Sequence, residues 1–322
     1  MNTLAVVGMG SIAKRHLANL RILHPAAKIY AVSASGSNTA LPENADAVVG
    51  IEQLIELAPD YVVVASPAPY HANVAIKLLA NNISVLIEKP LAHNFQTCSE
   101  LSTFCANQSQ NKAAVGYCLR FLPSALVVKN YLEQNLLGPV YNVYANVGQY
   151  LPSWRADKNY KDSVSANKEL GGGALLELSH ELDYLQWLLG DLTLLHSWLR
   201  TSDELGLAVE DIANLVLLTE KNTYVSVHLD FIQKSTQRKC EFIGKNGRLV
   251  WDLFENSVCL YSADGKDILF SEPEYNKNGM YLDMLSAFEN CGKNGGGSLA
   301  TVDSAMKVVK LIDEAKQLNR WR

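Results

Sequence analysis

Long hydrophobic runs are missing from this sequence of 322 residues. A helix that crosses a bilayer needs about 20 consecutive, mostly apolar residues, and no such run occurs here. The start of the chain, Met1-Asn2-Thr3, also has no basic segment and no cleavage site of the kind found in a secretory signal peptide. We therefore expect a cytoplasmic protein that has no membrane partner.

Cysteine patterns that bind metals or form disulfide frameworks are absent as well. The sequence contains no CxxC pair and no cluster of cysteine and histidine at metal-ligand spacing. The six cysteines are Cys98, Cys105, Cys118, Cys240, Cys259 and Cys291. Scattered cysteines of this kind are typical of reduced, buried thiols, which agrees with a cytoplasmic location. We predict no bound metal.

An excess of basic residues is the third feature that the sequence lacks. Lysine and arginine total 28 against 33 acidic residues, a formal net charge of −5. This balance argues against a nucleic-acid partner and against a polybasic membrane patch. Apolar residues at 48% and charged residues at 19% describe an ordinary globular protein, and the length favours two domains.

A glycine motif follows the first predicted strand directly. The strand, residues 4–7, runs into the pattern Gly8-x-Gly10-x-x-Ala13, and a helix is predicted over residues 14–23. In a strand-turn-helix context this pattern indicates a dinucleotide site, because Gly8 permits a tight turn and Gly10 lets the backbone approach a pyrophosphate. The pyrophosphate then lies at the helix N-terminus. We assign this site to Gly8, Gly10, Ser11, Ile12 and Ala13.

The end of the second predicted strand lacks an acid. In an NAD site a carboxylate near this position usually binds the adenosine ribose. Here Ser33 stands at the end of the strand, and residues 34–38 add serine, glycine and asparagine without an acid or a nearby arginine. Hydroxyl groups fit a ribose or a 2′-phosphate, so the expected cofactor is NAD or NADP, with the preference open.

A lysine ends the strand predicted over residues 83–87. The strand runs into Glu88-Lys89-Pro90, and the proline keeps Lys89 out of the helical region. Ligands of open α/β sheets bind at the carboxyl ends of the strands. Lys89 is therefore a candidate for the ligand site, although a surface pair of Glu88 and Lys89 would have the same sequence.

Strands and helices alternate over roughly the first 120 residues, a pattern that predicts a doubly wound parallel sheet. Another loop on the cofactor side, Ser66-Pro67-x-x-x-His71, follows the strand predicted over residues 61–65. We expect a Rossmann domain over residues 1–120. Residues 121–322 should form a substrate-binding and oligomerisation domain.

Four motifs resemble those of the Gfo/Idh/MocA family of NAD(P)-dependent oxidoreductases. They are Gly8-x-Gly10-x-x-Ala13, Ser66-Pro67-x-x-x-His71, Glu88-Lys89-Pro90 and Arg120-Phe121-x-Pro123. The resemblance implies a Rossmann domain followed by an α/β domain on a large, open, mostly antiparallel sheet. It also implies that Lys89 lies at the nicotinamide and touches the substrate. On this basis we assign cofactor binding also to Ser33, Ser66, Pro67, His71, Glu88 and Lys89, and substrate binding to Lys89, Tyr117 and Arg120.

A run of three glycines, residues 171–173, precedes a helix predicted over residues 174–189. On a helix, Glu177, His180 and Tyr184 fall within about 60° of one another, and Asp183 is close enough to orient the imidazole of His180. A histidine flanked by carboxylates is a reasonable general acid or base, whereas a solvated polar face would have the same pattern. We assign catalysis to Lys89, His180, Glu177 and Asp183, and substrate contact also to His180.

This segment resembles the family too, since the family carries a glycine pair, a helix and a His-x-x-Asp pattern. One position departs from the family. The family's carboxylate stands four residues before the histidine, where this chain has Leu176, and Glu177 stands three before. The assignment of Glu177 rests on its replacing that carboxylate.

A polar, aromatic stretch without periodicity extends from about residue 153 to residue 170. Loops of this length are uncommon unless they are functional or disordered. Trp154, Arg155 and Tyr160 suit a polar ring with a carboxylate or phosphate, so we assign them to substrate binding; a structural loop with a packed tryptophan is the alternative.

Strands dominate the chain after Gly190. Residues 193–261 predict a mostly antiparallel sheet, and one face of such a sheet needs a cover. Helices supply one cover and a second subunit supplies the other, so we expect a homodimer or a homotetramer.

The leading functional hypothesis is an oxidoreductase that moves hydride between NAD(P) and a hydroxyl-bearing carbon of a sugar, cyclitol or sugar-acid derivative. Lys89 and His180 would act at the reacting oxygen. The alternatives are an NAD-dependent glycosidase, as some relatives in the family are, and a non-catalytic NAD(P)-binding regulator. Net release of NADH, cleavage of a glycoside, and cofactor binding without turnover distinguish the three.

Overall fold

The computed structural model describes residues 1–33, 39–107, 112–154, 159–291 and 297–319. The chain forms two compact units. The first contains Met1–Cys118 and Tyr281–Val309, and the second contains Leu119–Met280 and the chain from Lys310 onward. We expected a single boundary after residue 120, and that expectation did not include the return of Tyr281–Val309 to the first unit.

Side-chain contacts explain why this late segment joins the first unit. Phe288 packs edge-on against Tyr61 with ring centroids 5.3 Å apart, and Glu289 accepts a hydrogen bond of 2.8 Å from the Tyr61 hydroxyl. Backbone pairing adds to these contacts, because Val115 N donates to Ala300 O at 2.9 Å. The segment is therefore fixed to the strands of the first unit.

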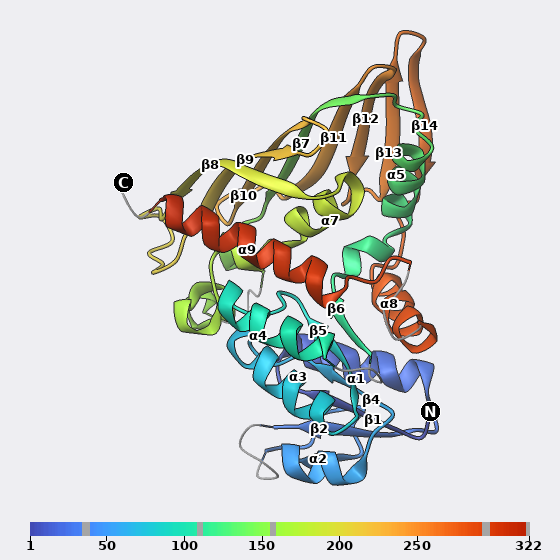
Figure 1. Ribbon diagram of the computed structural model, residues 1–322, viewed down its shortest axis with the longest axis vertical. Coiled ribbons are helices and arrows are strands. Elements are labelled where there is room, and N and C mark those ends of the chain that lie inside the picture. Colours follow the sequence, from blue (N-terminus) through green and yellow to red (C-terminus); the bar gives the residue numbers. More distant parts are fainter. Residues whose placement is uncertain (34–38, 108–111, 155–158, 292–296, 320–322) are drawn as a thin grey trace. The chain divides into compact units, whose positions relative to one another are not determined.

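The first unit is built on a six-stranded sheet in the order β3-β2-β1-β4-β5-β6, in which every pair is parallel. The strands are β1 (Thr3–Val7), β2 (Lys28–Val32), β3 (Ala47–Val49), β4 (Tyr61–Val64), β5 (Ser84–Glu88) and β6 (Ala113–Gly116). The helices are α1 (Ser11–Leu23), α2 (Ile51–Leu57), α3 (His71–Ala80), α4 (Phe95–Ala106), α8 (Gly279–Asn290), which ends in this unit, and the first part of α9 (Val302–Leu318) (Figure 1).

This topology confirms the predicted doubly wound sheet. The order of the strands reverses between β1 and β4, and ligands of such sheets bind beyond the carboxyl ends of the strands at that point. All four residues of β4 are buried, as expected for a central strand that has helices on both faces. The glycine motif after β1 and the loop after β4 therefore lie side by side at the ligand edge.

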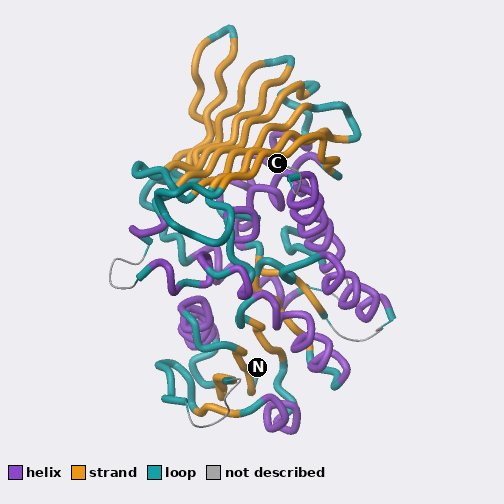
Figure 2. Tube along the Cα trace, turned by 90° about the vertical axis from the view of Figure 1, so that its left-hand side faces the viewer, coloured by secondary structure: helices purple, strands orange, loops and turns teal. Residues whose placement is uncertain are grey.

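The second unit contains an eight-stranded sheet in the order β14-β13-β12-β11-β7-β10-β9-β8. Figure 2 draws the strands in orange. The strands are β7 (Val140–Gly148), β8 (Leu192–Arg200), β9 (Ile212–Thr219), β10 (Tyr224–Asp230), β11 (Gln237–Gly244), β12 (Gly247–Asp252), β13 (Ser257–Ser262) and β14 (Gly265–Ser271). The helices are α5 (Pro123–Glu133), α6 (Ala174–Glu177), α7 (His180–Leu189) and the end of α9 (Val302–Leu318). Only β7 and β10 pair in parallel, so the sheet is mixed and mostly antiparallel, as predicted.

One face of this sheet is buried and the other is open. Along β7, Val143, Ala145 and Val147 are buried, whereas Tyr144 between them is exposed. The exposed Tyr224 of β10 meets Tyr144 with ring centroids 6.5 Å apart. Alternation of this kind marks a sheet with a core on one face only.

The helix predicted over residues 174–189 was wrong as a continuous element. The structure has α6 and α7 instead, with Leu178 and Ser179 between them. Different partners hold the two pieces, because α6 begins against Glu210 and α7 carries Asp183, which is bound by Arg120. The single helical wheel that placed Glu177 beside His180 therefore does not apply, although His180, Asp183 and Tyr184 still share α7.

Candidate functional site

Gly8 lies where the chain leaves β1 and passes over the end of β4. Its φ of +121° belongs to the region that favours glycine. A Cβ on Gly8 would stand 2.5 Å from Ala65 O and 3.0 Å from Ser66 N. Gly8 N also donates to Val32 O at 2.9 Å. The turn therefore needs a glycine at this position, and it joins the loop after β1 to the loop after β4.

Gly10 and the first turn of α1 form a candidate anion site. Gly10 is the N-cap residue, no side chain caps the helix, and the first turn contains no acid. A Cβ on Gly10 would meet nothing within 4 Å, while Ala13 is fully buried. Ser11 is exposed and Ile12 is half-buried. Open backbone N–H groups at a helix N-terminus suit the pyrophosphate of a dinucleotide.

Ser33 is buried just beyond β2, at the position where a ribose-binding acid is usual. Its hydroxyl accepts a hydrogen bond of 2.9 Å from Thr39 Oγ1, and its backbone N donates to Val49 O at 3.4 Å. Residues 34–38, which the prediction also included, lie outside the described residues. The described groups at this position are therefore hydroxyls.

Glu88 and Lys89, at the end of β5, lie in different environments. Lys89 is half-buried, while Glu88 is 6% exposed and its Oε1 lies 2.7 Å from His16 Nε2. The other carboxylate oxygen accepts a hydrogen bond of 3.1 Å from Lys89 N. The Lys89–Pro90 peptide bond is cis. The Glu88 carboxylate is therefore buried, and it contacts the backbone N of Lys89 and the imidazole of His16.

His71 is buried between two loops. Its Nε2 lies 2.6 Å from Ser66 O, and its Nδ1 lies 2.9 Å from Pro90 O. Burial lowers the pKa of His71, and the hydrogen bonds to the two carbonyl groups oppose that shift. With 1% of its surface exposed, the imidazole lies between backbone carbonyl groups of both loops. Ser66 and Pro67, in contrast, are half-buried at the ligand edge.

Arg120 and Asp183 form an ion pair in the second unit. Arg120 Nε donates to Asp183 Oδ2 at 2.8 Å, and Nη2 donates to Oδ1 at 2.6 Å. The guanidinium carbon also lies 5.6 Å from the ring centroid of Trp187. Burial raises the pKa of Asp183, and Arg120 opposes that shift. Both oxygens of Asp183 are therefore committed to Arg120.

His180 is the first residue of α7 and is 9% exposed. Glu177 ends α6 and is half-buried, whereas its neighbours Leu176 and Leu178 are buried. The opposite side of α7 is tied to the sheet, since Glu181 receives two hydrogen bonds of 2.7 and 2.8 Å from Arg238. The helix is fixed, and Glu177 is the acid of this segment that reaches solvent.

The other predicted substrate residues are placed as follows. Tyr117, directly after β6, is 1% exposed. Trp154 packs edge-on against Phe231 with ring centroids 5.4 Å apart. Tyr160 donates from its hydroxyl to a backbone carbonyl at 3.0 Å and is half-buried. Arg155 lies outside the described residues. Trp154 and Tyr160 therefore both make packing or hydrogen-bond contacts within the protein.

His16 and Glu210 make polar contacts next to segments that the sequence singled out, although neither was itself predicted as a site residue. His16 lies on the buried face of α1, six residues after Gly10, and a histidine on such a face needs a polar partner. Glu210 lies against the glycine run: a Cβ on Gly173 would stand 2.4 Å from Glu210 Oε1. Leu175 N donates to that oxygen at 3.2 Å. The helix pattern of α1 could have indicated His16, because it places that residue on the buried face. Glu210 is 35 residues away from Leu175, the residue that it binds, so no local pattern indicates the contact.

The predicted residues fall into one group in each unit. In the first unit, Gly8 lies against Ser66, His71 contacts the carbonyl groups of Ser66 and Pro90, and Glu88 contacts the backbone N of Lys89. In the second, Arg120 and Asp183 are joined. Within the described part of the chain, no group of three histidine, cysteine or acidic side chains could hold a metal ion, and no helix is long and apolar enough to cross a membrane.

Comparison with protein families gives two matches along the chain. Residues 3–117 match the model described as "Oxidoreductase family, NAD-binding Rossmann fold", and residues 126–250 match the "GFO/IDH/MocA C-terminal domain". The first match covers the sheet of the first unit and its glycine motif. The second covers most of the large sheet.

Curated relatives carry more than one activity in their names. The chain is 25% identical over 277 residues to inositol 2-dehydrogenase 2 of Paenarthrobacter aurescens, which covers 81% of this chain and 77% of that protein. It is 27% identical over 190 residues to 2,7-anhydro-N-acetylneuraminate hydratase of Escherichia coli, with 58% of this chain covered. The match spans about half of the hydratase, 49% of its length.

Solved structures share the whole fold. A levoglucosan dehydrogenase in complex with NADH and levoglucosan superposes with a TM-score of 0.85 at 18% identity, over 98% of this chain and 96% of that one. A GenD2 enzyme from gentamicin A biosynthesis in complex with NAD gives a TM-score of 0.80 at 21% identity, over 100% and 95%. At these identities the likeness shows the fold alone. The two family matches place the chain in the Gfo/Idh/MocA family of NAD-binding Rossmann oxidoreductases.

Proposed function

We propose that this protein is an NAD(P)-dependent oxidoreductase that moves a hydride between the cofactor and a hydroxyl-bearing carbon of a sugar, cyclitol or sugar-acid derivative. The observation that carries the proposal is the placement of Lys89. It is a half-buried lysine at the carboxyl end of β5, and the residues on both sides of it are held by buried side chains. It lies at the ligand edge of an NAD-binding Rossmann unit.

The cofactor fits the first unit on two grounds, which are the close approach at Gly8 and the open first turn of α1. Gly8, Gly10, Ser11, Ile12 and Ala13 would hold the pyrophosphate. Ser33 would bind the adenosine ribose, and the loops at Ser66, Pro67 and Glu88 would border the nicotinamide. A nicotinamide cofactor supplies the hydride chemistry when bound.

Lys89 and His180 divide the work at the substrate oxygen. The Lys89 ammonium donates a hydrogen bond to that oxygen and stabilises the alkoxide that develops during oxidation. The imidazole of His180 accepts the hydroxyl proton, a role that suits histidine because it changes charge near neutral pH. Glu177 takes part in the proton transfer, since it is the half-buried acid beside this segment.

Asp183 and Arg120 hold α7, the helix that begins with His180. Their two hydrogen bonds fix one side of α7, and Glu181 with Arg238 fixes another. His180 is thereby held at the start of a rigid helix. Trp154, Arg155, Tyr160 and Tyr117 complete the substrate-binding group in the proposal, and Arg120 is included through its hold on Asp183.

The substrate class comes from the relatives. The names of the matched proteins include dehydrogenases of inositol and of levoglucosan, and one solved relative is a complex with NADH and UDP-GlcNAcA. These substrates are polyols or sugar derivatives. A ring with several hydroxyl groups also suits a site that offers a lysine, a histidine and aromatic side chains.

One relative favours a second candidate function. The E. coli protein is named as a hydratase, so membership of the family does not by itself imply a net oxidation. We keep as the alternative a reaction in which the cofactor ends in the state in which it began, such as that of an NAD-dependent glycosidase. A non-catalytic NAD(P)-binding regulator is the third possibility.

A second copy of this chain is the partner we propose for the open face of the eight-stranded sheet. The face carries the exposed aromatic side chains of Tyr144, Tyr224 and Trp198. Pairs of opposite charge also lie on it, as in the contacts of 2.9 Å between Arg248 and Glu241 and of 3.0 Å between Lys239 and Asp252. A face with aromatic side chains and paired charges suits an isologous dimer. The six free thiols support a cytoplasmic, reducing location.

The test is a titration of the purified protein with NAD and NADP, followed by assays on myo-inositol, levoglucosan, UDP-GlcNAcA and 2,7-anhydro-N-acetylneuraminate. Net formation of NADH from one of these substrates supports the dehydrogenase. Conversion of substrate with no net NADH favours the second candidate. Cofactor binding without turnover of a wider polyol and glycoside panel would contradict both.

A further inference from the structure

Two buried histidines hold the residues on either side of Lys89. His16 of α1 contacts the side chain of Glu88, the residue before it, at 2.7 Å. His71 of α3 contacts the backbone carbonyl of Pro90, the residue after it, at 2.9 Å. His16 is 0% exposed and His71 is 1% exposed. Neither ring can therefore reach a ligand, but each can fix the backbone from which the Lys89 side chain extends.

These contacts close into a circuit. His71 Nε2 lies 2.6 Å from Ser66 O, and the backbone at Ser66 lies directly against Gly8. Gly8 and His16 belong to the same strand-turn-helix segment, so the path returns to its start. We define the Lys89 circuit as Gly8, His16, Ser66, His71, Glu88 and Pro90. It links the loop expected to hold the pyrophosphate to both neighbours of Lys89.

The position of Glu88 inside the circuit is confined. A Cβ added to Gly116 on the neighbouring strand would stand 3.3 Å from the Glu88 carboxylate. The carboxylate also accepts from Lys89 N at 3.1 Å. A buried ionic pair is weak evidence for stability, since well-packed apolar residues often serve as well. What the polar pair adds is a defined position for the backbone of Lys89.

We propose that His16 and His71 are positioning residues that hold Lys89 in its productive geometry. The proposal rests on the proposed function, in which Lys89 acts at the reacting oxygen. Loss of either contact releases one neighbour of Lys89, so the ammonium group samples positions away from the substrate. Binding of cofactor and substrate involves other groups and changes little.

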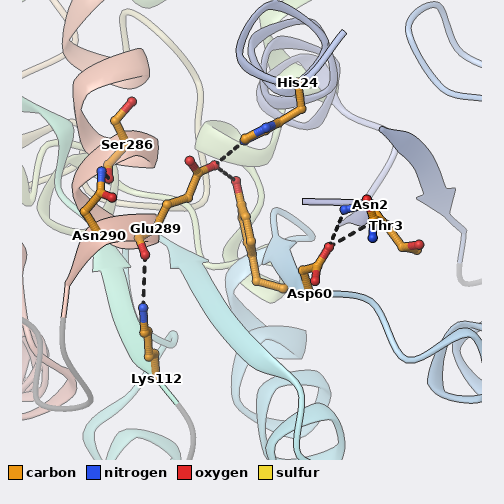
Figure 3. A network of polar contacts seen from close by, with 9 residues as sticks. Asn2, Thr3, His24, Asp60, Lys112, Ser286, Glu289 and Asn290 are labelled. Atoms are coloured by element: carbon orange, nitrogen blue, oxygen red, sulfur yellow. Dashed lines mark hydrogen bonds and ion pairs between the residues drawn. The ribbon is translucent and has the colours of Figure 1, made fainter. Parts of the chain in front are cut away.

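The same unit offers a matched control. His24 Nε2 lies 2.7 Å from Glu289 Oε1, the same atoms at the same distance as in the pair of His16 and Glu88 (Figure 3). This second pair lies at the other edge of the sheet. Glu289 also accepts from Tyr61, the first residue of β4, and its carbonyl accepts from Lys112, which precedes β6. His24 therefore makes the same kind of contact with a glutamate as His16 does, but its partner Glu289 is not next to Lys89 in the sequence.

The experiment compares His16→Leu, His71→Leu and His24→Leu in the full chain. Three quantities are measured: the melting temperature, kcat and KM with NAD and a polyol, and the rate at which a lysine-directed acylating reagent labels Lys89. We expect all three variants to lose stability. His16→Leu and His71→Leu should lose about tenfold to a hundredfold in kcat, the scale of a misplacement of about 1 Å, with KM little changed and Lys89 labelled faster. His24→Leu should keep kcat and the labelling rate.

Conservative variants provide the rescue. The amide of His16→Gln reaches the place of Nε2, and the amide of His71→Asn reaches that of Nδ1, so each should restore most of the kcat and the slow labelling. If the leucine variant of one histidine does not fold, the leucine and amide variants of the other histidine provide the test. The proposal is overturned if His16 and His71 variants keep kcat and labelling rate, or if His24→Leu loses both to the same extent.

The labelling rate separates this proposal from the proposed function. If Lys89→Met keeps full turnover, the role of Lys89 in catalysis is wrong. Faster labelling of Lys89 in His16→Leu would still show that the histidine holds the side chain. If Lys89→Met abolishes turnover while the histidine variants leave labelling unchanged, the function stands and the positioning role falls.

Discussion

Arg120 and Asp183 form a bidentate ion pair that is almost closed to water. The two hydrogen bonds measure 2.8 and 2.6 Å, and the side chains are 5% and 1% exposed. The pair connects the segment after β6 to α7, the helix that begins with His180. Both residues were predicted from the sequence as part of the site. Because they bind each other directly, we infer that they hold α7 in place.

Asp183→Asn should destabilise the protein strongly. The change keeps the shape of the side chain but leaves the buried guanidinium of Arg120 without its counter-charge, a loss of about 3–5 kcal/mol by comparison with other buried pairs. Urea unfolding measures the change in the free energy of unfolding. The control is Glu314→Gln, which breaks the exposed pair with Lys310 and should cost below about 0.5 kcal/mol. Similar losses in the two variants would contradict the structural role.

Glu210 should make stability depend on pH. Burial raises the pKa of Glu210 above its ordinary value of 4.5, and Lys316 only partly opposes the shift. The folded state therefore binds this proton more tightly than the unfolded state, so the contribution of Glu210 to stability falls as pH rises from 4.5 through the folded-state pKa. Glu210→Gln stays neutral and keeps an acceptor for Leu175 N.

The measurement for Glu210 is the urea midpoint of both proteins at several pH values between about 4.5 and 7.5. Relative to Glu210→Gln, the unmodified protein should lose stability as the pH rises within this window. A difference between the two proteins that grows in favour of glutamate would show that Lys316 and the helix amide outweigh burial.

Discrimination between NAD and NADP should be weak. Ser33 occupies the place of the carboxylate that would repel a 2′-phosphate, and its described partner there is the hydroxyl of Thr39. Paired titrations of the two cofactors check this. A preference for NAD above about a hundredfold, roughly 2.7 kcal/mol, would contradict the argument. Ser33→Asp should create such a preference by restoring the repulsion.

The open face of the large sheet should bring two or four copies of the chain together. Tyr144 and Tyr224 lie side by side on that face, so Tyr144→Lys places a charge where the partner would pack. Light scattering at micromolar concentration should report a multiple of 35.4 kDa for the unmodified protein and a smaller mass for the variant. A mass of 35.4 kDa for the unmodified protein would exclude the proposed assembly.

The sequence predicted the first sheet well because its signals are local. Its strands other than β3 are short apolar runs that the sequence predicted, and the glycine motif after β1 and Pro90 after Lys89 mark where the chain turns. The short strand β3 (Ala47–Val49) was not predicted. The break in the helix between Glu177 and His180 had no such signal. It depends on partners distant in the sequence, because Arg120 binds Asp183 from 63 residues away and Glu210 binds Leu175 N from 35.

The roles of individual polar residues were harder to predict than the fold. His71 and Glu88 were expected at the cofactor, and the structure gives their side chains to backbone groups and to His16. The linear sequence does not reveal which polar group is buried. A buried polar side chain needs a hydrogen-bond partner within the protein, whereas an exposed one is open to a ligand. The return of Tyr281–Val309 to the first unit was missed for the same reason, since tertiary contacts alone fix it.

Lys89→Met tests the central claim most directly. Methionine keeps the length and the apolar stem of lysine but removes the charge and the donors. An interaction that strengthens as the alkoxide develops lowers the barrier rather than tightening ground-state binding. We predict a loss of about a hundredfold or more in kcat, the scale of one lost oxyanion donor, with the Kd for NAD little changed.

His180→Asn sharpens the same measurement. If Lys89 and His180 act on one oxygen, the double variant should lose less than the product of the two single losses. Steady-state kinetics of the three variants with NAD and the best polyol substrate give all the terms. Near-normal kcat in Lys89→Met, with only a higher KM, would make Lys89 a binding residue and contradict the account.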